Sequence, residues 1–250
     1  MHGITKYEHR PAVLPGHQGR FPILCVGDAD VELPSLISRE AGSNDGARIV
    51  AMQIHPSHVT EAEVVQRQHL GQDIRDEEWE GVYHVTPPPT VDHQLVLAGL
   101  IHFLRELFIS RGGGTIVPEC SVFREDAPRR DYRIPDVVFV AAGRENIIAP
   151  DGIRGGAPDA VFEIRSPRDD SYTKFGFYAT LGVPEVVIVQ PDARAAEVWK
   201  LAGPHYERVA ADASGAVISR SLEVSFRTLP GTPPRLEIAD LRDPSRRMNI

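Results

Sequence analysis

The chain has 250 residues, of which 42% are hydrophobic and 25% are charged, and its formal net charge is -8. This composition excludes a disordered or low-complexity protein and predicts one globular domain, or one domain with an extension. The negative charge argues against a general affinity for nucleic acid, which depends on counterions released by lysine and arginine, but it permits a local basic groove.

The two cysteines, Cys25 and Cys120, lie far apart and form no C-x-x-C pair. We therefore expect reduced thiols, as in a cytoplasmic protein. No apolar run approaches the roughly 18 residues of a membrane span. The first residues also lack the basic-then-apolar pattern of a signal peptide. We expect a cytoplasmic protein with no membrane-bound part.

Residues 1–72 show no clear periodicity, and we interpret them as an N-terminal extension of unknown role. Thr60 followed by Glu63 is a capping-box pattern and predicts a short helix from Thr60 to Leu70. His55, His58 and Glu61 are residue types that bind transition metals, but they lack a known ligand spacing, so a polar loop is the favoured interpretation.

The segment after residue 72 becomes regular. Gly81–Val85 alternates like a strand and stops at three prolines. A helix is then predicted from Thr90 or Asp92 to Arg111, because apolar residues recur at helical spacing over one broad face. Three glycines, from Gly112 onward, end it.

Strands and one further helix are predicted after this point. The strands are Thr115–Phe123, Pro135–Ala141, Ala160–Arg165, Glu185–Val189, Ala195–Leu201 and His205–Ala210, and the helix is Ser171–Leu181. The order helix, strand, strand, strand, helix, strand predicts an α/β or α+β fold. In it, helices flank a central mixed sheet, and extra strands follow toward the C-terminus.

Two carboxylates interrupt the apolar strands. Asp136 and Glu163 stand among Val, Ile and Phe, where an unpaired charge costs several kcal/mol. Strand alternation can bring both to one face of the sheet if the strands are neighbours. Two close carboxylates repel unless they share a proton or a cation, and Mg²⁺ takes ligands of this kind. Lys174 on the next helix can add positive charge near a phosphate.

Each of these residues also has a purely structural interpretation. Asp136 could cap the turn that enters its strand, Glu163 could pair with Arg165 or accept a buried hydrogen bond, and Lys174 could lie on an exposed helix face. For one residue at a time the structural interpretation is favoured. The combination of all three weakens this preference, because carboxylates in apolar strands are costly without a reason, and it makes a metal site the alternative.

The motifs in this order resemble a known family. Pro135-Asp136 is followed by Glu163-Ile164-Arg165-Ser166-Pro167 and then by Lys174. Text around this core adds Glu77 to Tyr83, the three prolines, His93-Gln94, Gly182 to Glu185 and Leu229-Pro230-Gly231. The sequence from Asp73 to Leu241 is similar to the Uma2 family of restriction-endonuclease-like proteins, within the PD-(D/E)XK nuclease superfamily.

The resemblance implies a fold and a division of the chain. It implies a restriction-endonuclease-like core with elements in the order αβββαβ over residues 73–241. Residues 1–72 would be an extension and 242–250 a C-terminal tail.

The resemblance also implies a site. Asp136 and Glu163 would hold Mg²⁺ or Mn²⁺, with Lys174 as the catalytic cation and Glu77 as an additional acid near the metal. Arg165 stands where the superfamily motif E-x-K has lysine, so the resemblance leaves open which cation faces the phosphate.

The function implied is a Mg²⁺-dependent endodeoxyribonuclease that hydrolyses phosphodiester bonds of DNA and could act as a homodimer. The alternative is a catalytically idle nuclease fold that acts as a nucleic-acid-binding or regulatory module.

Overall fold

The computed structural model describes residues 60–166 and 171–250, so His55 and His58 of the proposed histidine cluster lie outside the described residues. The first element is helix α1 (Glu61–His69). Thr60 caps it in a complete capping box, in which the Thr60 hydroxyl accepts from the Glu63 amide and the Glu63 carboxylate accepts from the Thr60 amide at 2.7 Å. The helix predicted from this pattern is confirmed.

The central sheet has six strands. Their spatial order is β12 (His205–Arg208), β11 (Ala195–Ala202), β10 (Glu185–Gln190), β9 (Ala160–Ile164), β6 (Val137–Val140) and β3 (Thr115–Pro118). Strands β9 and β10 run parallel, and the other neighbours run antiparallel. A parallel pair needs a crossover, which α3 (Phe175–Leu181) supplies after the short 3₁₀ turn η3 (Ser171–Lys174). The predicted mixed sheet is confirmed.

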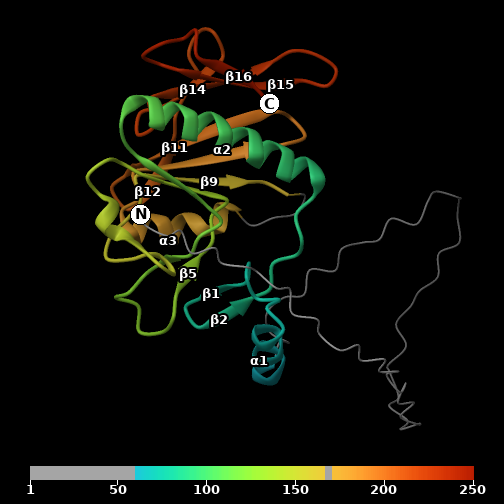
Figure 1. Cartoon of the computed structure of the whole chain (residues 1–250), viewed down its shortest axis with the longest axis vertical. Helices are drawn as coiled ribbons and strands as arrows, with labels where there is room; N and C mark the ends of the chain where they lie inside the picture. Colours follow the sequence, from blue (N-terminus) through green and yellow to red (C-terminus); the bar gives the residue numbers. More distant parts are fainter. Residues whose placement is uncertain (1–59, 167–170) are drawn as a thin grey trace, which may run out of the picture. The chain divides into compact units, whose positions relative to one another are not determined.

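Helices cover both faces of this sheet (Figure 1). Helix α2 (Val91–Arg111) is capped by the Thr90 hydroxyl and ends at Gly112, whose φ of 76° is left-handed. The side chains alternate between the two faces as strand periodicity predicts. The core on the α2 side contains Val137, Phe139, Phe162 and Ile164. The core on the α3 side contains Val138, Val140, Val161, Phe177 and Tyr178. The element order α2, β3, β6, β9, α3, β10 matches the predicted αβββαβ core.

A second sheet is built from very short strands. Their spatial order is β2 (Val82–His84), β1 (Glu77–Trp79), β5 (Tyr132–Arg133), β4 (Val122–Phe123), β8 (Gly152–Ile153) and β7 (Ile148–Ala149), and the 3₁₀ turn η2 (Glu145–Ile147) precedes β7. The prediction of one strand over Thr115–Phe123 is wrong, because β3 and β4 belong to different sheets. Glu119 has a φ of 45°, which turns the chain out of the central sheet.

A third sheet closes the core on the α2 side. Its strands are β13 (Ala216–Ser219), β14 (Val224–Leu229), β15 (Arg235–Asp240) and β16 (Arg247–Asn249). Phe226 meets Phe162 edge-on, with ring centroids 6.2 Å apart. Because β16 pairs with β15, and the Ile250 amide donates to the Leu236 carbonyl at 2.8 Å, the expected tail 242–250 carries part of this sheet.

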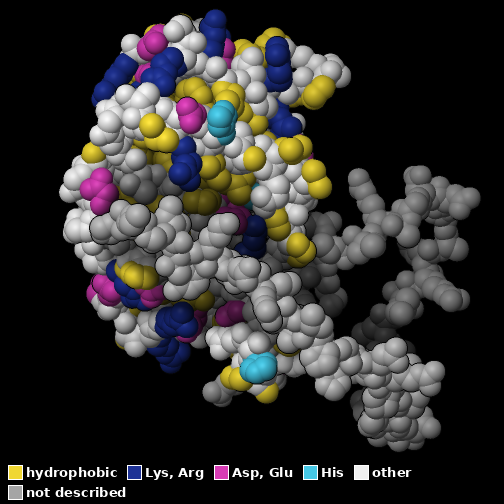
Figure 2. Space-filling model, in the orientation of Figure 1, with side chains coloured by type: hydrophobic (Ala, Val, Ile, Leu, Met, Phe, Trp, Pro, Cys, Tyr) yellow, Lys and Arg dark blue, Asp and Glu magenta, His cyan; other side chains and the backbone are white. Residues whose placement is uncertain are grey.

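The surface of the described part carries charges of both signs. On the face in Figure 2, basic and acidic side chains are interspersed. Several arginines are paired, as in Arg154 with Asp151 at 2.7 Å and Arg227 with Glu237 at 2.7 Å. Within residues 60–166 and 171–250, none of the helices combines the length and the apolar character of a membrane span.

Candidate active site

The central sheet sets Asp136 and Glu163 opposite each other. Strands β6 and β9 are antiparallel, with Val137 paired to Phe162. Asp136, the residue before Val137, therefore lies beside Glu163, the residue after Phe162. The Asp136 Oδ2 atom accepts a hydrogen bond from the Ile164 amide at 2.6 Å, which ties the carboxylate to the neighbouring strand. The strands next to the two acids are neighbours, which is the condition for the expected approach of Asp136 and Glu163.

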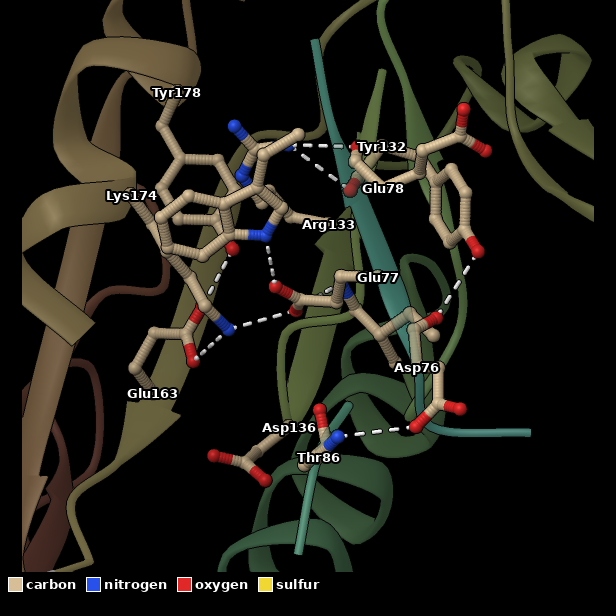
Figure 3. A network of polar contacts seen from close by, with 12 residues as sticks. Asp76, Glu77, Glu78, Thr86, Tyr132, Arg133, Asp136, Glu163, Lys174 and Tyr178 are labelled. Atoms are coloured by element: carbon tan, nitrogen blue, oxygen red, sulfur yellow. Dashed lines mark hydrogen bonds and ion pairs between the residues drawn. The ribbon is translucent and has the colours of Figure 1, made fainter. Parts of the chain in front are cut away.

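Lys174 brings a third element into the same place. It is the last residue of η3 and the first position before α3. Its Nζ atom lies 3.1 Å from Glu163 Oε2 and 2.9 Å from Glu77 Oε1, between the two carboxylates (Figure 3). The side chains of Lys174, Glu77 and Glu163 are only 12%, 6% and 5% exposed. The lysine is therefore a buried counterion and does not lie on an exposed helix face.

Glu77 is fixed by further donors. Its Oε1 accepts from the Ile134 amide at 2.8 Å, and its Oε2 accepts from the Trp79 indole at 2.7 Å. The Trp79 ring in turn lies against the Arg133 guanidinium, which is 4.3 Å from the ring centroid and equally 4.3 Å from that of Phe177. Glu77 is therefore held rigidly, and it orients Lys174 from the side opposite Glu163.

Glu163 is the most strongly perturbed acid of the group. Its Oε1 accepts a short hydrogen bond from the hydroxyl of Tyr178, which is fully buried. Burial raises the pKa of Glu163 to about 8. The Lys174 ammonium opposes this rise, and the charges of Asp136 and Glu77 add to it. Burial would lower the pKa of Lys174, but Glu163 and Glu77 raise it above its ordinary value. One ammonium therefore does not fully compensate the three neighbouring carboxylates.

His93 on α2 holds the other oxygen of Asp136. Its Nε2 lies 3.1 Å from Asp136 Oδ1, and the imidazole is buried. Burial would lower the pKa of His93, but the hydrogen bond and the charge of Asp136 outweigh it and raise the pKa. The Nδ1 atom has no hydrogen-bond partner in the described part of the chain. His93 thus positions Asp136 from the helix side.

The donor set suits a hard divalent cation. Asp136 and Glu163 contribute four carboxylate oxygens, and each of these oxygens accepts one hydrogen bond. A carboxylate oxygen has two lone pairs, so each keeps one for a further ligand. Oxygen ligands of this kind suit Mg²⁺ and Mn²⁺. Among residues 60–166 and 171–250, no three His, Cys, Asp or Glu side chains gather into a metal-binding group, so the ion would be held by this pair together with water.

Comparison with known proteins gives the family. The model of the Uma2 family, described as "Putative restriction endonuclease", matches residues 62–230, well over half of the chain. This chain belongs to the Uma2 family. The resemblance predicted from the sequence motifs is thereby confirmed, and Asp136, Glu163 and Lys174 all lie within the matched segment.

Solved structures similar to this Uma2 chain include that of a nuclease-like protein from a cyanobacterium. It is the crystal structure of "a putative nuclease belonging to DUF820" from Anabaena variabilis ATCC 29413, with a TM-score of 0.47 and 17% sequence identity. The similarity covers 59% of the Uma2 chain and 82% of that chain. A search of curated proteins returned no match.

In this Uma2 chain, Arg165 contacts an aromatic ring. Its guanidinium is placed over the ring of Tyr172, with the central carbon 5.1 Å from the ring centroid. Lys174 is the cation that contacts Glu163, so the motif position that usually carries lysine has a different neighbour here.

Three partners of the site were missed by the sequence reasoning. They are His93, Trp79 and Tyr178, which hydrogen-bond Asp136, Glu77 and Glu163, respectively. All three lie in the sequence segments that resemble the family, but nothing in their spacing indicates which acid each one hydrogen-bonds. A histidine on the buried face of α2 was the one available signal, since a buried imidazole needs a polar partner.

Proposed function

We propose that this Uma2 protein is an endonuclease that hydrolyses phosphodiester bonds of DNA with the help of Mg²⁺ or Mn²⁺. The observation that carries the proposal is the Lys174 ammonium held between the buried carboxylates of Glu77 and Glu163. Asp136 is next to this cluster in the sheet, because β6 pairs with β9, and its Oδ2 atom accepts from the Ile164 amide. Buried acids with one shared cation are costly for stability alone, which favours a catalytic role.

Asp136 and Glu163 would hold the metal ion. When bound, such an ion polarises a phosphoryl oxygen and lowers the pKa of a coordinated water. The chain prepares both ligands in advance, because His93 and the Ile164 amide orient Asp136, while Tyr178 orients Glu163. Pre-oriented ligands lose little freedom when the ion arrives.

Lys174 would act on the phosphate. An ammonium has three N–H donors, and the contacts with Glu77 and Glu163 use two of them. The third can be donated to a phosphate oxygen or to the attacking water. A fixed donor of this kind stabilises the charge that develops in the transition state. Glu77 positions the ammonium and in this way supports the reaction without touching the substrate.

The test is cleavage by the purified protein with Mn²⁺ or Mg²⁺ of supercoiled plasmid and of circular single-stranded DNA. We expect Asp136→Asn, Glu163→Gln and Lys174→Met each to lower the rate by about 10²–10³. Lys200→Met is the matched control, because Lys200 is exposed on β11 and should leave the rate unchanged. Equal cleavage by Lys174→Met and the wild type would show a contaminating nuclease and overturn the proposal.

The idle nuclease fold is the second candidate function. It is favoured by the Glu163 carboxylate, whose two oxygens already accept hydrogen bonds from Lys174 and Tyr178. Calorimetric titration with Mn²⁺ separates the two candidates. Binding that disappears in Glu163→Gln supports the metal-dependent nuclease, whereas a wild type that binds no ion supports the idle fold.

A further inference from the structure

A second pair of side chains lies next to the Glu163–Lys174 pair. Arg165 is two residues further along the chain from Glu163, and by strand alternation its side chain points to the same side of the sheet. Tyr172 is two residues before Lys174, in η3. The two meet, since the Arg165 guanidinium lies over the Tyr172 ring at 5.1 Å. At about 3.3 Å per strand residue, this pair stands roughly 7 Å from the Glu163–Lys174 contact along the sheet.

The Tyr172 ring is exposed and at the same time held in place. Its exposed fraction is 36%, which makes it one of the large apolar side chains that the described part leaves open to solvent. Its hydroxyl donates to Glu197 Oε2 at 3.0 Å. The rings of Phe175 and Trp199 meet it edge-on, with centroids 5.5 and 6.0 Å away. A ring that is fixed before binding loses little entropy when a ligand covers it.

Glu197 is the anchor of this ring. It is buried and accepts from three further donors, namely Gln190 at 3.1 Å, Trp199 at 3.0 Å and Arg208 at 3.2 Å. With the Tyr172 hydroxyl, four donors meet a carboxylate that has about four acceptor positions. A fully satisfied network of this kind is rigid. In the part of the chain that the structure describes, no hydrogen bond or ion pair joins the donors of Glu197 to Glu77, Glu163 or Lys174, so those three residues do not account for the network.

A planar guanidinium over an aromatic ring suits a nucleobase, which can stack on either partner of this pair. Unpaired bases stack on Tyr and Trp rings and on arginine planes in proteins that bind single strands. A base inside a duplex has both faces covered by its neighbours in the stack. The Arg165–Tyr172 pair therefore favours a nucleotide whose base lies outside a duplex.

We propose that Arg165 and Tyr172 form a stacking platform for an unpaired base beside the phosphate that Lys174 contacts, so that the site takes single-stranded DNA. The position relative to the scissile phosphate rests on the proposed function. The stacking itself does not, because it needs neither the metal ion nor catalysis.

The test is equilibrium binding, in EDTA, of a short oligothymidylate and of a duplex of equal length. We expect the single strand to bind more tightly than the duplex. Tyr172→Ala should weaken single-strand binding by about ten-fold or more, since stacking on one ring contributes a factor of roughly 5 to 150. Tyr172→Phe, which keeps the ring, should stay within about three-fold of the wild type. Arg165→Lys, which keeps the charge but not the plane, should fall between them.

Salt dependence distinguishes stacking from charge. The slope of log affinity against log salt should be the same for the wild type and Tyr172→Ala, because a tyrosine neutralises no phosphate. A circular dichroism spectrum equal to that of the wild type confirms that the variant is folded. A changed slope would mean that the substitution displaced lysine or arginine side chains that neutralise phosphates. The weaker binding would then not come from lost stacking, which would count against the platform.

The binding test and the cleavage test can overturn their two proposals independently. If Tyr172→Ala binds the single strand as tightly as the wild type, or if the duplex binds more tightly than the single strand, the platform is overturned while metal-dependent cleavage can stand. If Tyr172→Ala loses binding but the wild type cleaves neither DNA form, the platform stands and the nuclease proposal fails.

Discussion

Lys174 joins two distant parts of the chain. Its ammonium contacts Glu77 from β1 and Glu163 from β9, and the three side chains are almost completely buried. Two carboxylates in this position are tolerated because the cation contacts both and because Trp79, Ile134 and Tyr178 donate further hydrogen bonds to them. The same residue therefore compensates buried charge and, in the proposed function, acts on the phosphate.

Replacing Lys174 should reduce stability as well as activity. Lys174→Met leaves two buried carboxylates without their cation, and breaking a buried pair from one side costs about 3–5 kcal/mol. The free energy of unfolding, measured by urea denaturation, should fall by this amount. Lys200→Met on the exposed part of β11 should stay within about 0.5 kcal/mol of the wild type. Equal stability of Lys174→Met and the wild type would contradict the buried ion pair.

Much of the central sheet could be predicted at the level of elements, because each long element carries its own signal. The apolar run of β9 and the Thr90 and Gly112 caps of α2 are local. The second sheet could not be predicted in this way. Its strands are two or three residues long and are held by partners far away in the sequence, as in Glu78 with Tyr132. The same holds for the site. The acids stand out as charges in apolar strands, but their donors are chosen only by the tertiary fold.

Strand β8 depends on a glycine. Gly152 has a φ of 144°, and a Cβ atom there would lie 2.2 Å from the carbonyl oxygen of Ser121. We expect Gly152→Ala to lower the free energy of unfolding by about 2–4 kcal/mol, from backbone strain and the clash. Gly176 in α3 is the matched control, because a Cβ there meets nothing within 4 Å. Gly176→Ala should stabilise by about 0.5–1 kcal/mol. If Gly152→Ala had wild-type stability, the close approach of β8 to Ser121 would be wrong.

The end of α2 is clamped to the third sheet by a buried ion pair. Arg111 Nη2 lies 2.6 Å from Asp240 Oδ1 and also donates to the Glu223 carbonyl. Burial opposes ionisation, but hydrogen bonds from the Arg242 amide and from Arg111 outweigh it and lower the pKa of Asp240. Its folded pKa therefore lies below the ordinary value of 3.8, so its contribution is present above that pH and is lost as the pH falls through the lowered pKa.

Asp240→Asn tests this clamp. At neutral pH we expect a loss of about 1.5–3 kcal/mol in the free energy of unfolding, the usual contribution of hydrogen bonds to a charged group. The difference from the wild type should shrink as the pH falls below about 4. Asp192→Asn, at an exposed aspartate, should show no difference at either pH. A loss for Asp240→Asn that did not depend on pH would exclude the charge as its cause.

The third sheet connects the last residues of the sequence to the first long helix. Leu222, in the turn before β14, and the sheet residues Val224, Phe226, Leu236 and Ile238 belong to the same core as α2. Ile250 packs so closely on Gly99 that a Cβ atom there would lie 2.9 Å from the isoleucine side chain. Residues far along the chain from Glu77, Glu163 and Lys174 are thus part of one continuous core. The homodimer and the cytoplasmic location implied by the sequence stay predictions.

A chain shortened to end at Arg246 should be measurably less stable. It loses the pairing of β16 with β15, the two hydrogen bonds between Ile250 and Leu236, and the apolar contact on Gly99. We expect the free energy of unfolding to fall by roughly 2–5 kcal/mol. Ile250→Ala removes only the side-chain contact and should cost less. If the shortened chain unfolded at the same urea concentration as the full chain, residues 247–250 would contribute nothing to the core.

The two tryptophans of the chain are placed where their fluorescence can report on ion binding and on base stacking. The Trp79 indole donates to Glu77 at 2.7 Å, and the Trp199 indole donates to Glu197 at 3.0 Å. One indole therefore contacts Glu77, a partner of Lys174, and the other contacts Glu197, the anchor of Tyr172. Intrinsic ultraviolet emission should respond to ion binding through Trp79 and to base stacking through Trp199. In Trp199→Phe, the remaining emission comes from Trp79 alone, so the two signals can be separated without any attached dye.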